Sequence, residues 1–357
     1  MRKYLLFAIS VILLNACVSE PTAPIDDKII IGKTGAYIIC EGLWHYDNSS
    51  LSQYIADSNT VVNNVYNIVN TGERLGDLAN GGAIHNGYLY IVMTTSAIVE
   101  KIDLKSGKSI AKLQIEKDSD PRKIYIVNDS LAYISCLRTH SVRAINPGLM
   151  QNLNINIPTG PAPEYICGNG RYVFVANSGY GDYLANVPKA GTISVIDISS
   201  NQVLKDLYCG PNAIEVKVNA KRNMLYGVYY HLPSETDSVG GIVEYDLSTL
   251  KETRRVQIRA NALNFSNSGD SLIFATDSGV MYADLNQAQI TPKLMIANPN
   301  TQEKWYSLNV SADNRLFIGN AKNYQMQGEL LIYNFTVGGS LLNKFQIGTN
   351  PNSILFY

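Results

Sequence analysis

The amino-acid sequence predicts an all-β protein in which one four-stranded unit is repeated, and three observations lead to this. The first is a unit of four apolar runs, with a polar turn after the first run and an Asp or Asn ending the third. The second is the spacing, since successive units begin about 40 to 50 residues apart, as four-stranded propeller blades do. The third is that the chain has an incomplete unit at each end, and the two complement each other.

The repeated elements follow one another in the same order along the chain. The turn after the first run recurs at Asn86-Gly87, Asn128-Asp129, Gly168–Gly170, Asn219–Asn223, Ser266–Asp270 and Ser311–Asn314. The third run recurs at Val99–Asp103, Val142–Asn146, Ile193–Asp197, Ile242–Asp246, Val280–Asp284 and Leu330–Asn334. A terminal Asp or Asn suits a tight turn, because its side chain can bond the backbone two residues further on. The β-branched and aromatic residues of these runs favour strands.

The two ends of the chain together supply one more unit. Residues 350–357 are typical of a first strand with nothing after it, whereas Ala36–Cys40, Leu51–Ile55 and Val61–Val69 are typical of a unit without its first strand. We therefore predict a seven-bladed β-propeller over residues 35–357, with residues 35–73 and 350–357 in blade 1 and residues 74–349 in blades 2 to 7. Such closure removes exposed sheet edges. A β-sandwich array or a solenoid is the alternative, and a solenoid would need capping units at its ends.

The first residues are typical of a targeting segment. Arg2 and Lys3 precede the apolar run Leu5–Leu14, which is too short to span a membrane but suits a signal peptide. The tetrad Leu14–Cys17 resembles a bacterial lipobox, whose cysteine is acylated, for example with palmitate. The resemblance implies that residues 1–16 are removed, that Cys17 is lipidated and that residues 17–34 are a tether. An ordinary secretory signal with a coincidental cysteine is the alternative.

The lipobox resemblance also sets the expected location. A lipid anchor would make a membrane of the cell envelope the first partner of the protein. Ser19 and Glu20 follow Cys17 without the aspartate that retains many lipoproteins at the inner membrane. We therefore expect the outer membrane, at either its surface or its periplasmic face.

Composition excludes one class of partner and leaves the cysteines open. The net charge is −1 and only 17% of residues are charged, which argues against nucleic acid as a partner. Cys40, Cys136, Cys167 and Cys209 could pair in three ways. Because each lies in or beside an apolar run, small buried hydrophobic residues are favoured over a disulfide framework.

Candidate ligand-binding residues gather on one predicted face of the propeller. The loops between second and third strands, and the loops between blades, share that face and tolerate variation. They carry Trp44, His45, Tyr46, Arg122, His140, Tyr180, Tyr183, Tyr230, His231, Trp305 and Tyr324. Exposed Trp, Tyr and Arg dominate binding sites, so we expect this face to bind a small molecule or a transport partner. The alternative for Trp44 and Trp305 is that they cover the core at the rim.

Catalytic and metal-binding patterns are missing from the sequence. We find no Gly-x-Ser-x-Gly elbow, no phosphate-binding glycine loop and no His-Glu-x-x-His motif. His45, His140 and His231 come from blades spread around the ring, which is unfavourable for a shared metal ion. We therefore predict no catalytic residues, no metal and no cofactor. Two alternatives remain open: a lactonase-like or quinoprotein-like enzyme with a metal in the central channel, and a scaffold that docks proteins.

Two resemblances make these expectations more specific. Tyr172–Asn177 resembles the Tyr-Val-Thr-Asn (YVTN, YncE-like) propeller repeat. Cys40–Gly42, Asn48–Tyr54 and Leu75–Asn80 together resemble the opening of a Bacteroidota family of propeller lipoproteins, some of which capture cobalamin for an outer-membrane transporter. This resemblance implies that Glu41, Gly42, Asp77 and Asn80 lie at a ligand-facing end, with a corrinoid as ligand and such a transporter as partner. Cys40 and Leu43-Trp44 depart from that family's usual Asn and Gly-Asn.

Overall fold

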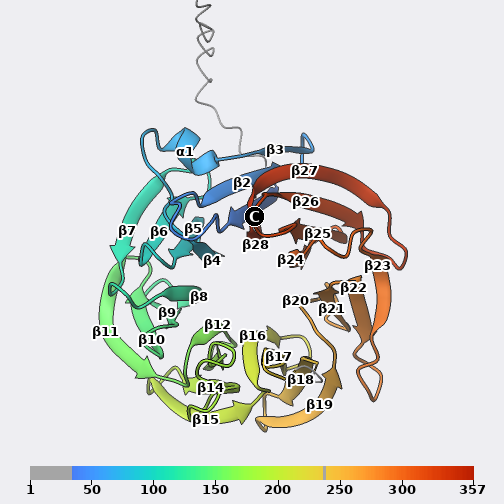
Figure 1. Ribbon diagram of the computed structural model, residues 1–357. Coiled ribbons are helices and arrows are strands. Elements are labelled where there is room, and N and C mark those ends of the chain that lie inside the picture. Colours follow the sequence, from blue (N-terminus) through green and yellow to red (C-terminus); the bar gives the residue numbers. More distant parts are fainter. Residues whose placement is uncertain (1–33, 236–238) are drawn as a thin grey trace, which may run out of the picture. The chain divides into compact units, whose positions relative to one another are not determined.

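The computed structural model describes residues 34–235 and 239–357, and within these ranges the strands form seven antiparallel sheets of four strands each. Figure 1 shows the sheets as blades around a central opening, each with one strand at the centre and one on the outside. The predicted all-β, seven-bladed propeller is confirmed. The predicted signal peptide, Cys17 and residues 18–33 of the tether lie outside the described residues.

The blades are numbered here in chain order, with blade 1 formed by β28, β1, β2 and β3. From blade 1 to blade 7, the innermost strands are β28 (Pro351–Phe356), β4 (Ala79–His85), β8 (Pro121–Asn128), β12 (Pro163–Gly168), β16 (Asn212–Asn219), β20 (Ala262–Phe265) and β24 (Trp305–Val310). The second strands are β1 (Gly35–Cys40), β5 (Tyr88–Met93), β9 (Leu131–Cys136), β13 (Tyr172–Asn177), β17 (Met224–Tyr230), β21 (Ser271–Thr276) and β25 (Arg315–Asn320).

The outer half of each blade follows the same order. The third strands are β2 (Ser50–Ile55), β6 (Ile98–Asp103), β10 (Ser141–Asn146), β14 (Thr192–Asp197), β18 (Gly241–Asp246), β22 (Gly279–Asp284) and β26 (Gln327–Asn334). The outermost are β3 (Thr60–Val62), β7 (Ser109–Gln114), β11 (Gln151–Pro158), β15 (Gln202–Tyr208), β19 (Lys251–Gln257), β23 (Lys293–Ala297) and β27 (Leu341–Thr349). All six predicted third runs lie within β6, β10, β14, β18, β22 and β26.

The ring closes through blade 1, as predicted. Strand β28 pairs antiparallel with β1, from Ala36 opposite Phe356 to Cys40 opposite Pro351. Backbone hydrogen bonds continue the pairing beyond the strand, since the N–H of Glu41 donates to the carbonyl of Asn350 (3.0 Å). The sheet therefore joins residues from both ends of the described chain, and its inner edge is covered by β28.

One predicted strand of blade 1 is wrong in part. The run Val61–Val69 was predicted as a single strand, but the structure ends β3 at Val62 and forms the short helix α1 over Val65–Val69. Asn64 adopts a left-handed conformation (φ 55°), which turns the chain out of the strand. Short apolar runs do not distinguish strand from helix. Tyr66 of α1 is buried, and its hydroxyl lies 3.1 Å from Oε2 of Glu73 and 3.2 Å from Oε1 of Glu100.

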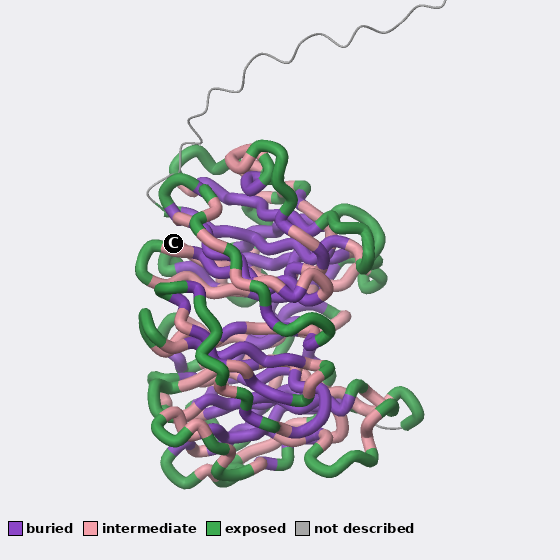
Figure 2. Tube along the Cα trace, turned by 90° about the vertical axis from the view of Figure 1, so that its left-hand side faces the viewer, coloured by how far each residue is buried: buried purple, intermediate pink, exposed green. Residues whose placement is uncertain are grey.

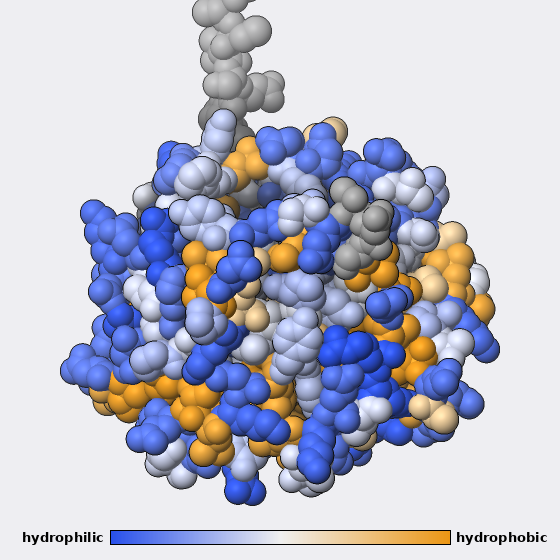
Figure 3. All heavy atoms as spheres, turned by 60° about the horizontal axis from the view of Figure 1, so that its bottom comes forward, coloured by the Kyte–Doolittle hydropathy of each residue, from blue (hydrophilic) through white to orange (hydrophobic). Residues whose placement is uncertain are grey.

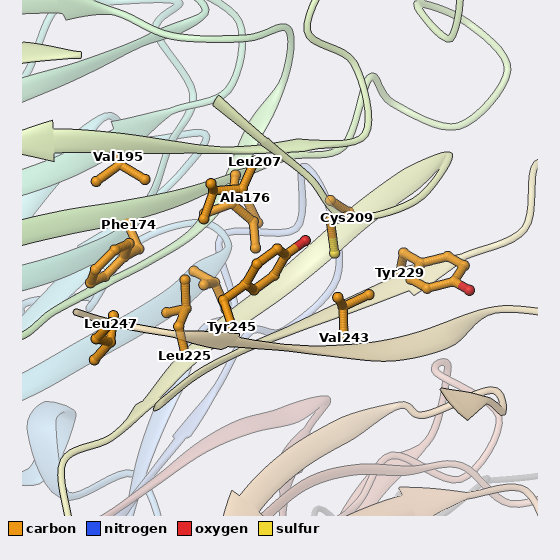
Figure 4. Close-up of a cluster of buried hydrophobic side chains, with 13 residues drawn as sticks. Phe174, Ala176, Val195, Leu207, Cys209, Leu225, Tyr229, Val243, Tyr245 and Leu247 are labelled. Carbon is orange, nitrogen blue, oxygen red and sulfur yellow. The ribbon is translucent and has the colours of Figure 1, made fainter. Parts of the chain in front are cut away.

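The hydrophobic core lies between neighbouring blades. Figure 4 shows one such layer, in which side chains of blade 4, such as Phe174 and Val195, face side chains of blade 5, such as Leu225 and Val243. These four residues are fully buried. Alternation along each strand turns every second side chain to one side of the blade, so stacked sheets interdigitate around the ring. This stacking gives a rigid support for whatever the inner strands present to the channel.

Exposed loops stand out from one side of the ring in Figure 2. They connect second to third strands, as between β13 and β14 (residues 178–191), and they lie at the same end as the first residues of the innermost strands. No helix among the described residues is long and apolar enough to cross a membrane.

Candidate ligand-binding site

The centre of the ring holds a cavity of about 600 Å³ between the innermost strands of the seven blades. Its polar and charged lining residues are Glu41, Asn80, Arg122, Lys123, Glu164, Glu215, Lys217, Asn261, Asn264, Ser307, Asn309, Asn352 and Ser353. Three tyrosines, Tyr165, Tyr230 and Tyr306, also line it, and apolar lining residues include Ile124, Ile166, Leu263 and Leu308. A volume of this size is typical of small-molecule sites.

A β-bulge near the start of the innermost strand turns polar side chains into this cavity. The register of six of the seven described inner pairings shifts there, on β4, β8, β12, β16, β24 and β28. A bulge leaves a residue without a partner on the neighbouring strand and re-aims its side chain. The residues at the shifts are Asn80, Arg122, Lys123, Glu164, Tyr165, Ile214, Tyr306 and Asn352, and all of them line the cavity.

The sequence marks this level of the channel with a short pattern. Proline precedes the bulge, and isoleucine stands three residues after the proline, at residues 121–124, 163–166 and 351–354. The same pattern occurs at residues 211–214, where Ile214 itself is at the bulge. Proline has no N–H to contribute to a ladder, so it is tolerated at the start of an edge strand. We name the group formed by Glu41, Arg122, Lys123, Glu164, Tyr306 and Asn352 the mouth cluster.

Glu41 is buried at one side of the mouth cluster. Its Oε1 accepts hydrogen bonds from the Tyr306 hydroxyl (3.0 Å) and from Nδ2 of Asn352 (2.7 Å). Burial raises the pKa of Glu41 above its usual value, although these hydrogen bonds and the positive charges of Arg122 and Lys123 oppose the shift. Burial and the charge of Glu41 also raise the pKa of Tyr306. The Glu41 carboxyl therefore holds its proton to a higher pH than an exposed glutamate.

Two cations from β8 lie beside this carboxyl. Nε of Arg122 donates to Glu164 at 2.8 Å. Burial lowers the pKa of Arg122, but Glu164 and Glu41 outweigh it and raise the pKa above its usual value. Nζ of Lys123 donates to the backbone carbonyl of Asn80 and lies 5.3 Å from the ring centre of Tyr165. Burial lowers the pKa of Lys123 to about 8.

Aromatic rings form the wall of the mouth on blades 5 to 7. Tyr306 packs edge-to-face against Tyr324, with ring centroids 5.4 Å apart. Arg259 lies 4.9 Å over the ring of Tyr230, whose hydroxyl is 3.4 Å from Oδ1 of Asn261. Such ring pairs and cation–π contacts fix the orientation of tyrosines.

Deeper in the channel a second charged pair is partly satisfied by the protein itself. Nζ of Lys217 donates to the carbonyl of Leu263 (2.6 Å) and lies 3.7 Å from Oε1 of Glu215. Oε2 of Glu215 accepts a hydrogen bond from the N–H of Leu263. Burial raises the pKa of Glu215. The channel therefore stays polar below the mouth.

Comparison with known families identifies the chain at the level of the family. A family model described as a domain of unknown function, DUF5074, matches residues 34–228, more than half of the chain. The chain belongs to the DUF5074 family. No curated protein matches the sequence.

Solved structures similar to this DUF5074 protein share its fold at low identity. A hydrazine synthase chain from Kuenenia stuttgartiensis is 14% identical with a TM-score of 0.63, over 79% of this chain and 91% of that one. A quinonprotein alcohol dehydrogenase-like protein from Bacteroides thetaiotaomicron is 14% identical with a TM-score of 0.66, over 90% and 78%. The computationally designed Ika8 protein is 14% identical with a TM-score of 0.53, over 78% and 95%. At this identity, the likeness shows the fold alone.

Four of the predicted ligand-binding residues of this DUF5074 protein line the cavity: Glu41, Asn80, Arg122 and Tyr230. Tyr324 lies at its rim, against Tyr306. The side chain of Asn80 is buried, and its Nδ2 donates to Oγ1 of Thr94. The cavity and its rim therefore bring together predicted residues of blades 1, 2, 3, 5 and 7.

Other predicted residues lie on the exposed loops. Trp44 is 65% exposed with its ring against His45, Tyr46 is 68% exposed, and Tyr180 and Tyr183 form an edge-to-face pair in the β13–β14 loop. Figure 3 shows hydrophobic residues in separate groups among hydrophilic ones on the face turned to the viewer. Trp305, in contrast, is 1% exposed and packs on Tyr333 in the core, so the core alternative holds for Trp305.

The predicted histidines and Asp77 contact the backbone or neighbouring loops. Oδ2 of Asp77 accepts a hydrogen bond from the N–H of His45 (2.9 Å), which ties the β1–β2 loop to blade 2. Nδ1 of His140 accepts one from the N–H of Ala162 (3.0 Å). Nδ1 of His231 is buried without a hydrogen-bond partner in the described part of the chain. Among residues 34–235 and 239–357, no group of three or more His, Cys, Asp or Glu is placed to hold a metal ion.

The sequence argument missed half of the mouth. Lys123, Tyr306 and Asn352 were not predicted. The proline–isoleucine pattern was the available signal for Lys123 and Asn352, which lie between its ends at residues 121–124 and 351–354, whereas no such pattern surrounds Tyr306. The four described cysteines are free, and burial raises the thiol pKa of Cys40, Cys136 and Cys209 to about 12.

Proposed function

We propose that this DUF5074 protein is a non-catalytic binding protein that holds a small molecule in the mouth of its propeller channel. The observation that carries the proposal is the bulge repeated at one level of six inner strands. Each bulge interrupts the hydrogen-bond ladder between two strands, which does not help the sheet to fold. Because the bulged residues line a cavity of about 600 Å³, their arrangement favours ligand binding.

Two features of the mouth cluster support this use. Its residues come from four blades, so their mutual distances are set by the rigid ring and not by one flexible loop. It also retains polar atoms without protein partners, such as the buried Oδ1 of Asn352. Buried polar atoms are normally hydrogen-bonded, and a ligand or water would satisfy this one.

The cellular setting belongs to the same proposal. Lipidation at Cys17 would anchor the propeller to the outer membrane of the cell envelope, where a captured molecule could pass to a transporter. A corrinoid is larger than the ligands that a cavity of this volume encloses. It would therefore cover the mouth and reach the β1–β2 loop, in which Trp44 is exposed.

The test is a thermal-shift screen of the full chain in detergent, with corrinoids, haem, sugars, aromatic acids and divalent metals. A ligand at a hundredfold excess over its dissociation constant stabilises the fold by about 2.7 kcal/mol. A shift that is lost in Arg122→Gln, but kept in the matched surface variant Arg74→Gln, supports binding at the mouth. A ligand whose shift is unchanged in Arg122→Gln contradicts the site, and a screen without any shift contradicts the function.

General acid–base catalysis in the same cavity is a second candidate function. Glu41, whose pKa is raised, and Lys123, whose pKa is lowered to about 8, lie beside each other in the mouth. Such shifted pairs are enriched in catalytic sites. Conversion of a bound ligand to a product, abolished in Glu41→Gln, would establish catalysis, whereas return of the ligand unchanged would exclude it.

A further inference from the structure

Resting on the proposed function, we infer the class of ligand: an organic anion whose negative group lies against Arg122 and Lys123 and whose flat body lies against Tyr306. The shared chemistry is a carboxylate or phosphate on an aromatic or apolar body. The inference depends on three observations: unused cationic donors, an aromatic wall opposite them, and the titratable groups that surround the cations.

The first observation concerns the donors of β8. Arg122 uses Nε for Glu164, and no hydrogen bond within the described residues uses its Nη1 or Nη2. The ammonium group of Lys123 has three N–H donors and uses one of them for the carbonyl of Asn80. Lys123 forms no ion pair with another described residue. Both side chains line the cavity. A guanidinium beside an ammonium, with several N–H groups free, is the arrangement that binds carboxylate and phosphate oxygens.

The second observation is the position of the aromatic wall. Figure 1 places β8 and β24 on opposite sides of the central opening. Tyr306 is the second residue of β24 and lines the cavity, and Tyr324 packs edge-to-face against its ring. Arg122, Lys123 and Tyr306 all line the one cavity. A ligand that touches both walls therefore combines an anionic end with a flat or apolar end.

The third observation is the balance of charge around the cations. Lys123 is faced by the carboxyls of Glu41, Glu164 and Glu215 and by the guanidinium of Arg122. Burial raises the pKa of both Glu41 and Glu215, which favours their neutral forms. Glu164 is the carboxylate paired with Arg122. With Lys123 charged below about pH 8, the mouth holds two cations, Arg122 and Lys123, whose remaining N–H groups can bind an anion.

The experiment compares three isosteric probes on the full chain by calorimetry at pH 7: phenylacetate, phenylacetamide and 2-phenylethylamine. We expect phenylacetate to bind about tenfold more tightly than phenylacetamide, the weight of one charge-assisted hydrogen bond, and the amine to bind least. Equal or tighter binding of the amide or the amine overturns the inference but leaves the proposed function standing. The same holds if a sugar or corrinoid binds at the mouth and none of the three probes does.

A fourth probe separates the two sources of the anion. Phenyl phosphate and phenylacetate carry the same ring, so the tighter of the two identifies a phosphate or a carboxylate ligand. Inorganic phosphate alone should compete weakly with either, because it lacks the ring that would lie against Tyr306. Competition by inorganic phosphate as strong as that by phenyl phosphate contradicts the aromatic half of the inference.

A matched pair of lysine variants tests the cationic half. Lys123→Met should weaken phenylacetate binding about tenfold and leave phenylacetamide binding unchanged. Lys101→Met is the control, since Lys101 is also buried with its Nζ on the carbonyls of Pro147 and Gly148, but lies outside the cavity. Unchanged phenylacetate affinity in Lys123→Met overturns the assignment.

A pH series on the unaltered chain gives the same test without a variant. Phenylacetate affinity should fall as the pH rises from 7 through about 8, where Lys123 loses its proton, whereas phenylacetamide affinity should stay level. A flat profile for both probes, in a chain that binds them, contradicts a role for Lys123.

Discussion

Two buried groups of charged residues in this molecule use the same side-chain types in opposite ways. In blade 5, Glu244 accepts hydrogen bonds from Tyr226, from Thr253 (2.6 Å) and from Nε of Arg254 (2.7 Å). Burial raises the pKa of Glu244, but these donors outweigh it and bring the pKa below its usual value. In the mouth cluster, Glu41 has fewer donors and its pKa is raised.

The difference teaches how to separate structural from functional charge. The blade 5 group is complete, because the carboxylate and guanidinium satisfy each other and nothing is left to bind. The mouth cluster is incomplete, with donors on Arg122 and Lys123 and an acceptor on Asn352 left unused. Buried polar groups that lack partners destabilise a fold, so an incomplete group that lines a cavity points to a ligand.

Of the changes that distinguish the two groups, deleting residues 350–357 should have the largest effect on stability. It removes β28 and with it Asn352, so it opens blade 1 and breaks the mouth cluster, while no residue of the blade 5 group is touched. We expect loss of the cooperative thermal transition measured by circular dichroism, because the inner edge of β1 loses its partner strand and the ring is no longer closed. Asn352→Ala, which keeps the strand, is the control. A truncated chain that melts like the full chain would rule out the closure.

Removing one partner of the complete group should have the next largest effect. Arg254→Met leaves Glu244 buried and without its cation, which typically destabilises a fold by about 3 to 5 kcal/mol. The free energy of unfolding, from denaturant titration, measures it. Arg74→Met, which breaks an exposed pair with Asp47, should change stability by less than about 1 kcal/mol. Similar losses in the two variants would show that the blade 5 group is not special.

Glu41→Gln should not destabilise the fold as Arg254→Met does, because the surroundings of Glu41 favour the uncharged form of its carboxyl. Since the folded-state pKa of Glu41 is raised above 4.5, the unaltered chain loses stability as the pH rises from that value through the folded pKa. Glutamine does not ionise, so Glu41→Gln should gain stability relative to the unaltered chain between pH 5 and 8. Unfolding titrations at both pH values measure this gain. An identical pH dependence in the two chains would mean that Glu41 is not held in its neutral form.

The smallest effect on stability is expected at the rim. Tyr324→Ala should leave the free energy of unfolding within about 0.5 kcal/mol and weaken phenylacetate binding, because Tyr306 loses the ring that supports it. Tyr183→Ala, on a residue that is 82% exposed in the β13–β14 loop, should change neither quantity. Equal binding losses in the two variants would move the site from the mouth to the loops.

The fold was readable from the sequence because its signals are local and repeated. Each turn needs Asn, Asp or Gly, and each strand needs an apolar run. Six copies of the same pattern therefore strengthen the prediction of one repeated blade. The prediction of one strand over Val61–Val69 was wrong because no other blade repeats this segment. The change from β3 to α1 depends on the left-handed conformation of Asn64 and on the burial of Tyr66.

The site was less predictable because it depends on distances between blades. Lys123 looked like any charged residue near a strand end, and only the bulge turns it inward. Tyr306 and Asn352 belong to different blades and both meet Glu41 through hydrogen bonds. Trp305 was expected on the binding face, but the residue after it is the one the bulge exposes. A register shift of one residue decides which neighbour meets the ligand.

Closure by β28 has a consequence for the order in which the protein can mature. Strands β1 and β28 are separated by nearly the whole described chain, and contacts of such long separation form slowly. Each of blades 2 to 7 takes its four strands from one continuous stretch of chain and can assemble first, while β1 waits with an open edge. Glu41 meets Asn352 only at the last step, so binding competence would report that the ring has been sealed.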